Sequence, residues 1–388
     1  MKGFFAGLIC LLTLLQPKPV NAQTDSACRF RISVLTCSPG DDLYSLFGHN
    51  ALRIIDTIKR TDIIYNWGTF DFYDPDFYPK FVRGKLLYSL EPQILPGFLQ
   101  EYKEEGRSVM EQVLDLSCEE KMEIKKTVDI NMIGDNRFYK YDFLLDNCTT
   151  RIRDILQKNI KGINEPVPLV PVGTTFRDMI HAYLDQGSQP WSKLGIDILL
   201  GSKIDRPVTN TEAMFLPDFL MKGIDSAKVN GNSTVITKQL ILDAKPRVEM
   251  QGIYKPLMII GIICLVLFLI SFLKTPAIIT VIKFTDTLLV LVTGFIGLLI
   301  LFMWFFTDHW SCDNNYNIAW ALPTNFIAAF ATWKRPQWIR KYFKVAVVLM
   351  GLLLITWFWI PQEMNIAIAP FCLYMFYRYI ELSRSKKI

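Results

Sequence analysis

The chain has 388 residues, of which 51% are hydrophobic and 20% are charged. A soluble protein usually carries about a quarter charged residues, so we expect part of this chain to lie in lipid, and the length predicts two or three domains. The composition excludes collagen, a coiled coil and intrinsic disorder. The net charge is +5, but the basic residues near the C-terminus form short clusters between apolar segments. This arrangement is typical of membrane topology, and we expect no nucleic-acid partner.

Residues 1–22 are predicted to be a signal peptide. Lys2 supplies the positively charged N-terminal region of a signal peptide. The apolar run Gly3–Leu15 that follows is too short to span a bilayer comfortably. Small residues at Val20-Asn21-Ala22 match a signal-peptidase site. An uncleaved anchor is the alternative. The domain that follows should face an oxidising compartment outside the cytoplasm.

The first chemically interesting segment is a predicted hairpin that begins near His49. Apolar residues alternate over Ala51–Ile55, a turn is expected at 56–60, and a second strand over 63–68. This hairpin brings Asn66–Gly68 opposite His49. The Asn66 side chain would then hold one imidazole nitrogen and select the tautomer.

The second segment centres on Cys148. The apolar residues Ile152, Ile155 and Leu156 follow it with helical spacing, which predicts Cys148 at or just inside a helix N-terminus. At that position the helix dipole lowers a thiol's pKa, and backbone N–H groups can bind an oxyanion. A nucleophilic cysteine also needs a histidine within hydrogen-bond reach, and His49 is the candidate.

Residue types alone leave a structural alternative open. In an oxidising compartment Cys148 could instead be a half-cystine, and the pairing stays open among the other cysteines expected on that side: Cys28, Cys37, Cys118 and Cys312. His181 lies in an apolar, helical pattern and is expected to be structural.

Residues 23–250 have the composition of a soluble domain, whereas 251–388 are predicted to form a transmembrane domain. Five apolar segments are expected to be helices, although several are a little short for the roughly 20 residues that a bilayer core requires: Leu257–Leu273, Leu288–Phe306, Ile318–Trp333, Phe343–Ile360 and Ile366–Tyr379. Lys274 and Lys283 flank the first loop, and basic loops alternate with non-basic ones. The positive-inside rule places the basic tail in the cytoplasm and residues 23–250 on the far side.

Two further polar features are candidates for binding. Arg151 could bind a phosphate, or it could be a helix-surface charge that pairs with Asp154. His309, in the polar loop between the second and third apolar segments, could contact a lipid headgroup; interfacial anchoring by Trp310 is the alternative. No nucleotide-binding or zinc motif occurs in the sequence, so we expect neither a metal nor a cofactor.

Four motifs make the chain resemble a known family. In chain order they are Ser38-Pro39-Gly40, Leu46-Phe47-Gly48-His49, Tyr65–Phe72 (YNWGTFDF) and Asp146–Arg151 (DNCTTR). Together with the five apolar segments they resemble the Lnb-type lipoprotein N-acyltransferases. The resemblance covers essentially the whole mature chain, but it is vague over 160–250, a segment without an assigned task.

The resemblance implies an α+β fold: a permuted papain/NlpC-P60-like thiol-enzyme domain, with the His strand before the Cys helix, followed by an all-α transmembrane bundle of about five helices. It makes Cys148 the nucleophile and His49 its base. The third catalytic residue, which orients the histidine, is assigned to Asn66, with Asp71 as an alternative. We also expect a substrate-binding set: Asn147, Thr149, Arg151 and His309.

The implied reaction joins a phospholipid acyl donor to a diacylated lipoprotein acceptor in the bacterial inner membrane, with the catalytic domain in the periplasm among membrane lipids. The phospholipid acylates Cys148, and the α-amine of the diacylglyceryl-cysteine then attacks the thioester. One alternative is a membrane-anchored thiol hydrolase, either a cell-wall peptidase or amidase or a phospholipase. Another is a non-catalytic receptor or assembly factor in which Cys148 forms a disulfide.

Overall fold

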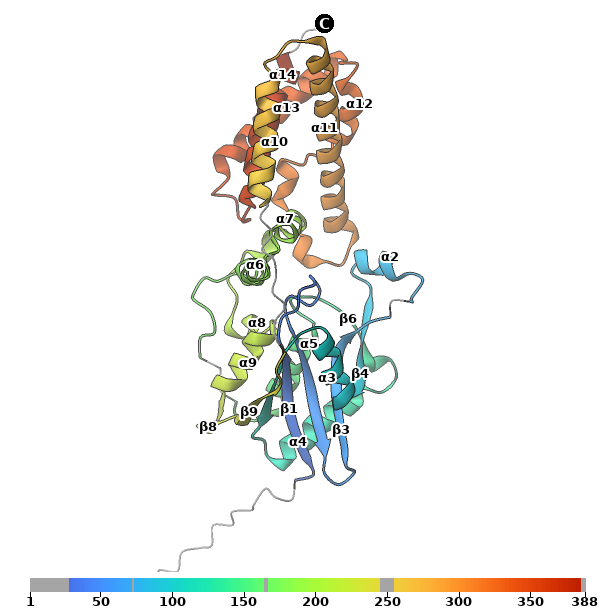
Figure 1. Ribbon diagram of the computed structural model, residues 1–388, viewed down its shortest axis with the longest axis vertical. Helices are drawn as coiled ribbons and strands as arrows, with labels where there is room; N and C mark the ends of the chain where they lie inside the picture. The colour runs from blue at the N-terminus through green and yellow to red at the C-terminus, as the bar shows by residue number, and fades with distance from the viewer. Residues whose placement is uncertain (1–27, 72, 164–166, 245–254, 385–388) are drawn as a thin grey trace, which may run out of the picture.

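The computed structural model describes residues 28–71, 73–163, 167–244 and 255–384. A sheet domain lies at one end of an elongated molecule and a helical region at the other (Figure 1). The predicted signal peptide and the predicted domain boundary at 250 fall outside the described residues.

The sheet domain is built on seven strands in the order β6-β4-β3-β2-β1-β5-β9, with every neighbouring pair antiparallel. The strands are β1 (Phe30–Cys37), β2 (His49–Asp56), β3 (Thr61–Thr69), β4 (Leu87–Ile94), β5 (Val109–Leu114), β6 (Phe138–Lys140) and β9 (Val235–Leu242). The expected hairpin is present as β2 and β3, with Leu52 paired to Tyr65.

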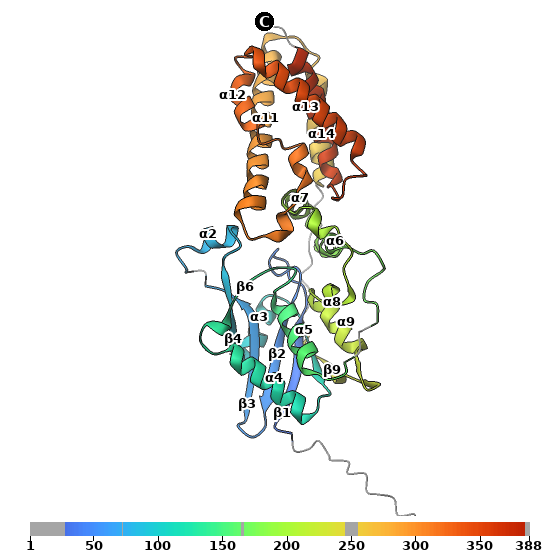
Figure 2. The ribbon, with the colours of Figure 1, turned by 180° about the vertical axis from the view of Figure 1, so that it is seen from behind.

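Helices cover both faces of this sheet, because alternate strand residues point to opposite sides. Ile32 and Val34 of β1 pack on one face in a cluster with α4 (Cys118–Asn131) and α5 (Cys148–Asn159). Leu35 and Cys37 pack on the other face, in a cluster with α3 (Leu95–Glu104). The two faces are seen in turn in Figures 1 and 2.

The segment without an assigned task, 160–250, contributes to both the sheet and the junction with the helical region. It forms α6 (Phe176–Gln186), α7 (Pro190–Leu199), α8 (Asn210–Ala213), α9 (Pro217–Ser226), the short hairpin β7 (Lys228–Val229) and β8 (Asn232–Ser233), and β9. Strand β9 extends the sheet beside β5. Helices α6 and α7 lie between the sheet and the helical region (Figure 1).

The helical region contains α10 (Pro256–Ile270), α11 (Pro276–Phe306), α12 (Asn325–Thr332), α13 (Gln337–Thr356) and α14 (Ala369–Arg384). Of the described helices, only α11 is both long and apolar enough to cross a bilayer on its own. The predicted third span, Ile318–Trp333, is α-helical only over α12 and starts in a short 3-10 helix, Tyr316–Ala319, because Pro323 cannot continue a helix. Lys283, which was expected to flank a loop, lies inside α11. Five membrane-spanning helices therefore stay a prediction.

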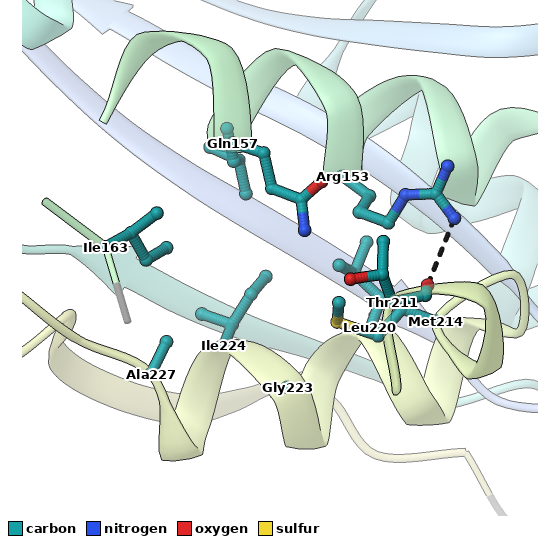
Figure 3. A pocket seen from close by; sticks show the side chains of 10 residues that line it. Arg153, Gln157, Ile163, Thr211, Met214, Leu220, Gly223, Ile224 and Ala227 are labelled. Atoms are coloured by element: carbon teal, nitrogen blue, oxygen red, sulfur yellow. Dashed lines mark hydrogen bonds between the residues drawn. The ribbon is translucent and has the colours of Figure 1, made fainter. Parts of the chain in front are cut away.

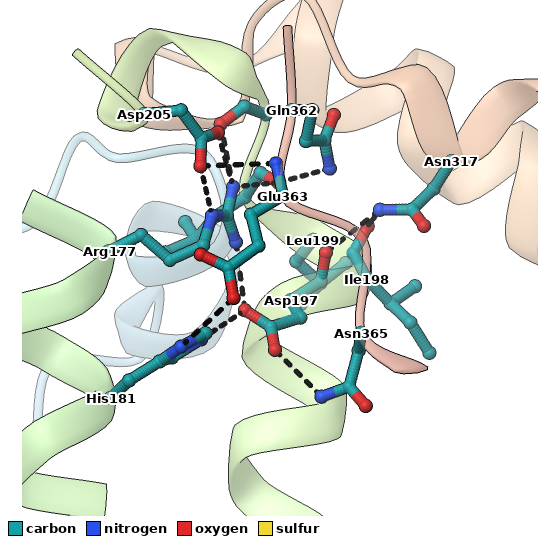
Figure 4. Close-up of polar contacts among 12 residues, drawn as sticks. Arg177, His181, Asp197, Ile198, Leu199, Asp205, Asn317, Gln362, Glu363 and Asn365 are labelled. Atoms are coloured by element: carbon teal, nitrogen blue, oxygen red, sulfur yellow. Dashed lines mark hydrogen bonds and ion pairs between the residues drawn. The ribbon is translucent and has the colours of Figure 1, made fainter. Parts of the chain in front are cut away.

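Buried charges fix the sheet domain to the helical region (Figure 4). Arg177 on α6 is 1% exposed and donates to Asp197 on α7 at 2.8 Å and to Asp205 at 2.7 Å. Asp197 also accepts hydrogen bonds from His181 and from Asn365, which precedes α14. A buried guanidinium needs such partners. His181 therefore has the structural role that was expected.

Replacing Asp197 by Ala is expected to destabilise this junction by about 3–5 kcal/mol, because it removes one partner of a buried ion pair. Thermal unfolding of the full chain in detergent measures the loss. Asp185→Ala is the matched control, since it removes an exposed ion pair with Lys193 between the same two helices, worth about 0–1 kcal/mol. Equal melting temperatures for the two variants would contradict the assignment.

Candidate active site

His49 is the first residue of β2, opposite Cys37 on β1. Strand β2 begins at the end of the sheet nearer the helical region (Figure 2). The chain enters the strand through Gly48, whose φ is +79°. A Cβ at Gly48 would lie 2.9 Å from the carbonyl oxygen of Cys37. Only glycine accommodates both the dihedral angle and this close approach.

Asn66 on β3 holds the imidazole as expected. The His49 Nε2 lies 2.6 Å from the Asn66 Oδ1. The Asn66 Nδ2 donates to the Oε1 of Gln93 on β4 at 3.1 Å, so the amide oxygen faces the histidine. An amide oxygen only accepts hydrogen bonds. The His49 Nε2 therefore carries the proton, and its Nδ1 is left as the base.

Cys148 is the first residue of α5, and Asn147 caps that helix. The Asn147 Oδ1 accepts from the backbone N–H groups of Thr149 and Thr150 at 2.8 and 2.9 Å, and Thr150 Oγ1 accepts from the Asn147 N–H. This reciprocal pattern is a capping box. It holds the thiol in the first turn, at the positive end of the helix dipole.

Gly68 shows that the thiol and the imidazole share one site. Its φ is +104°, at a register shift in the pairing of β3 with β4. A Cβ placed there would lie 3.8 Å from the His49 Cε1 and 3.9 Å from the Cys148 Cβ. The fold therefore brings the strand start and the helix start to the two sides of one glycine.

The electrostatics of this pair favour a thiolate. Burial alone raises the pKa of the Cys148 thiol, but the charge and hydrogen bond of His49 and the backbone N–H of Asn50 outweigh burial and lower this pKa to about 7. Burial lowers the pKa of His49, whereas Cys148 and the hydrogen bond to Asn66 raise it, and the net shift is upward. A cysteine with such a pKa is nucleophilic near neutral pH.

Cys148 carries a free thiol, whereas Cys28 and Cys118 form a disulfide. Cys37 and Cys312, the other two candidates for pairing, are free and buried. The sequence left this pairing open. The free state of Cys148 disfavours the alternative of a disulfide-bonded receptor.

The four residues expected to bind substrate lie in different surroundings. The Thr149 Oγ1 is 3.7 Å from the Cys148 Sγ. Asn147 is buried, and its Nδ2 donates to two backbone carbonyls while its Oδ1 caps α5, so the geometry favours a structural role. Arg151 pairs with Asp146 at 2.5 Å rather than with Asp154. His309 contacts the backbone of Phe81, outside the thiol site.

Sequence reasoning missed Gln93. Gln93 lies on β4, which becomes the neighbour of β3 only through strand pairing. The predicted hairpin did place Gly68 near His49, but no local pattern placed Cys148 on the other side of this glycine.

Two family models match the chain. The Lnb N-terminal periplasmic domain matches residues 18–182, and the Lnb transmembrane domain matches residues 248–387. The chain belongs to the Lnb-type family. None of the curated proteins and none of the solved structures compared with it matches. Membership of the Lnb-type family indicates a membrane protein with a periplasmic part, and suggests an enzyme that modifies lipoproteins.

One cavity of this Lnb-type chain lies apart from the thiol. It measures about 230 Å³ and lies between α5 and α9 (Figure 3). Most of its lining is apolar, and neither Cys148 nor His49 contributes to it. The chemistry of the site therefore rests on the end of the sheet and not on this cavity.

The rate at which iodoacetamide alkylates Cys148 is expected to rise with pH around a midpoint near 7, because the thiolate forms as pH passes this pKa. His49→Ala should move the midpoint upward toward the ordinary cysteine value of about 8.5. Intact-protein mass spectrometry over a pH series gives both midpoints, and Cys148→Ala gives the background. Identical midpoints would show that His49 does not act on this thiol.

Asn66→Ala is expected to lower kcat about tenfold, because it removes a hydrogen bond worth about 1.5 kcal/mol that orients the imidazole. Asn66→Asp keeps an acceptor oxygen toward Nε2 and should retain more activity than the alanine variant. Rates of the reaction proposed below, measured for both variants, test this assignment. Equal losses in the two variants would mean that Asn66 acts through packing.

Proposed function

We propose that this chain is a lipoprotein N-acyltransferase. It moves an acyl chain from a phospholipid, through a Cys148 thioester, to the α-amine of the N-terminal diacylglyceryl-cysteine of lipoproteins. The observation that supports this proposal is a free thiol of lowered pKa beside His49, at the end of the periplasmic sheet nearer the transmembrane domain.

In the first half-reaction, the His49 Nδ1 takes the proton of the Cys148 thiol. The thiolate attacks the ester carbonyl of the phospholipid, and the positive end of α5 stabilises the oxyanion. The ester C–O bond then breaks. The lysophospholipid leaves with a proton from the His49 imidazolium, and the acyl group stays on sulfur as a thioester.

In the second half-reaction, the neutral α-amine of the lipoprotein attacks the thioester carbonyl. His49 removes a proton from the attacking nitrogen, the C–S bond breaks, and the Cys148 thiolate is released. The product is an amide. Both substrates are anchored in a membrane, so a domain attached to membrane helices meets them in two dimensions instead of three.

The same proposal extends to the fold and the location. The His strand precedes the Cys helix in the chain, and α5 packs against β2 and β3, as expected of a permuted papain/NlpC-P60-like thiol enzyme. We propose that α10–α14 form the five spans of an inner-membrane bundle. Of the expected substrate-binding residues, Thr149 has the best-placed side chain, because its hydroxyl adjoins the sulfur.

Reconstitution of the purified chain with phospholipid and a diacylated lipopeptide tests the reaction. We expect lysophospholipid and N-acylated lipopeptide in equal amounts. Cys148→Ser should abolish both products and the acyl adduct, because the site is suited to a thiolate and not to an alkoxide. Cys264→Ala, a free cysteine on α10, is the matched control and should remain active.

Two results would contradict the proposal. Wild-type rates in the serine variant would remove Cys148 as the nucleophile. Free fatty acid without N-acyl product would identify water as the acceptor and favour the membrane-anchored hydrolase.

A further inference from the structure

The short helix α2 (Phe77–Val82) presents an exposed apolar surface beside the end of α11 (Figure 1). Tyr78 is 76% exposed, Phe81 51% and Val82 42%. These three residues are called the α2 surface below. Clustered exposed apolar side chains of this kind mark an interaction site.

The end of α11 gives the height of this surface relative to the bilayer. The 31 residues of α11 extend roughly 46 Å, which exceeds a hydrocarbon core of about 30 Å. Lys283 and Asp286 lie near its start, and an uncharged run leads to Phe306, after which Asp308 follows. Phe306 therefore marks the outer edge of the hydrocarbon, and Asp308 lies at the level of the headgroups.

Two hydrogen bonds connect the α2 segment to the loop after α11, at the level of the headgroups. The backbone N–H of Asp308 donates to the carbonyl of Arg83 at 3.0 Å, and the His309 Nε2 lies 3.1 Å from the carbonyl oxygen of Phe81. Gly84, with a φ of +66°, permits this contact, because a Cβ there would lie 3.2 Å from the His309 ring.

The basic residues that follow α2 fit the same location. Arg83 and Lys85 are exposed, whereas the acidic Asp74 and Asp76 lie before the helix and Asp74 pairs with Lys80. Lys140 also pairs with Asp308, which adds a further contact between the sheet domain and the loop. Basic residues next to exposed aromatic ones suit the phosphate and glycerol layer of a bilayer.

A row of aromatic rings leads from α2 to the thiol. Phe77, the buried residue of α2, lies 5.7 Å from Phe70 between ring centroids; Phe70 lies 5.0 Å from Tyr88, and Tyr88 4.3 Å from Tyr141. Tyr141 and Cys148 pack against the same cluster of buried apolar residues, so the row ends at the cluster that Cys148 contacts.

We propose that the α2 surface inserts into the headgroup layer of the periplasmic leaflet, and that a phospholipid leaves the bilayer there and follows the aromatic row to Cys148. The insertion rests on the transmembrane domain of the family. The route to the thiol rests on the proposed function.

A spin label at position 78 tests the insertion without catalysis. Tyr78→Cys is placed in the full chain carrying Cys148→Ala, labelled, and reconstituted in nanodiscs of phosphatidylethanolamine and phosphatidylglycerol. Ile58→Cys is the matched control, because Ile58 is 72% exposed in the β2–β3 turn at the far end of the sheet. The signal of the labelled parent chain is subtracted from both.

We expect the label at 78 to be reached by oxygen and shielded from an aqueous nickel complex, and the label at 58 to be reached by nickel. Equal nickel accessibility at the two positions would overturn the insertion. Dipolar broadening between labels at 78 would show a second copy on the α2 surface and would overturn it as well.

The route is tested by the double variant Tyr78→Ser/Phe81→Ser, with Ile58→Ser as its control. We expect thioester formation from bilayer phospholipid to fall about tenfold, because the apolar contact with the bilayer is lost, and that from a monomeric short-chain phospholipid to stay unchanged. Equal losses with both donors would overturn the route. A wild-type chain that forms no thioester with either donor would instead contradict the proposed function.

Discussion

The contact between the Cys148 thiol and the His49 imidazole is the interaction on which the function depends. It exists only where the start of β2 meets the start of α5, on the two sides of Gly68. Burial by itself would keep the thiol protonated, and the imidazole reverses that effect. The cap by Asn147 and the hydrogen bond that Asn66 accepts from His49 matter because they hold these two groups in position.

Two attachments hold this site at a fixed height relative to the transmembrane domain. One is the buried cluster around Arg177 and Asp197, and the other is the loop after α11, which binds the α2 segment and pairs with Lys140. A buried ion pair adds little net stability, but its geometry is specific. In the proposed reaction, a site that draws both substrates from a bilayer requires a constant height more than additional stability.

Much of the fold followed from local patterns. Alternating apolar residues predicted the β2–β3 hairpin, and helical spacing after Cys148 predicted the start of α5. The apolar segments near the C-terminus became helices, but α12 is shorter than expected because of Pro323, and Lys283 lies inside α11 rather than beside a loop. Within the segment 160–250 only the helical pattern around His181 was interpretable, and it forms α6; the other elements of this segment are organised by contacts with distant parts of the chain.

The sequence by itself determined the two segments that carry the thiol and the imidazole, the start of the Cys148 helix and the family, since short runs of neighbouring residues carry all of these signals. Only the tertiary structure decided that Gln93 orients Asn66, that Cys28 pairs with Cys118, and that Asp197 joins the two regions. These contacts depend on strand order and helix packing. Strand order and packing bring together residues whose separation along the chain carries no local signal.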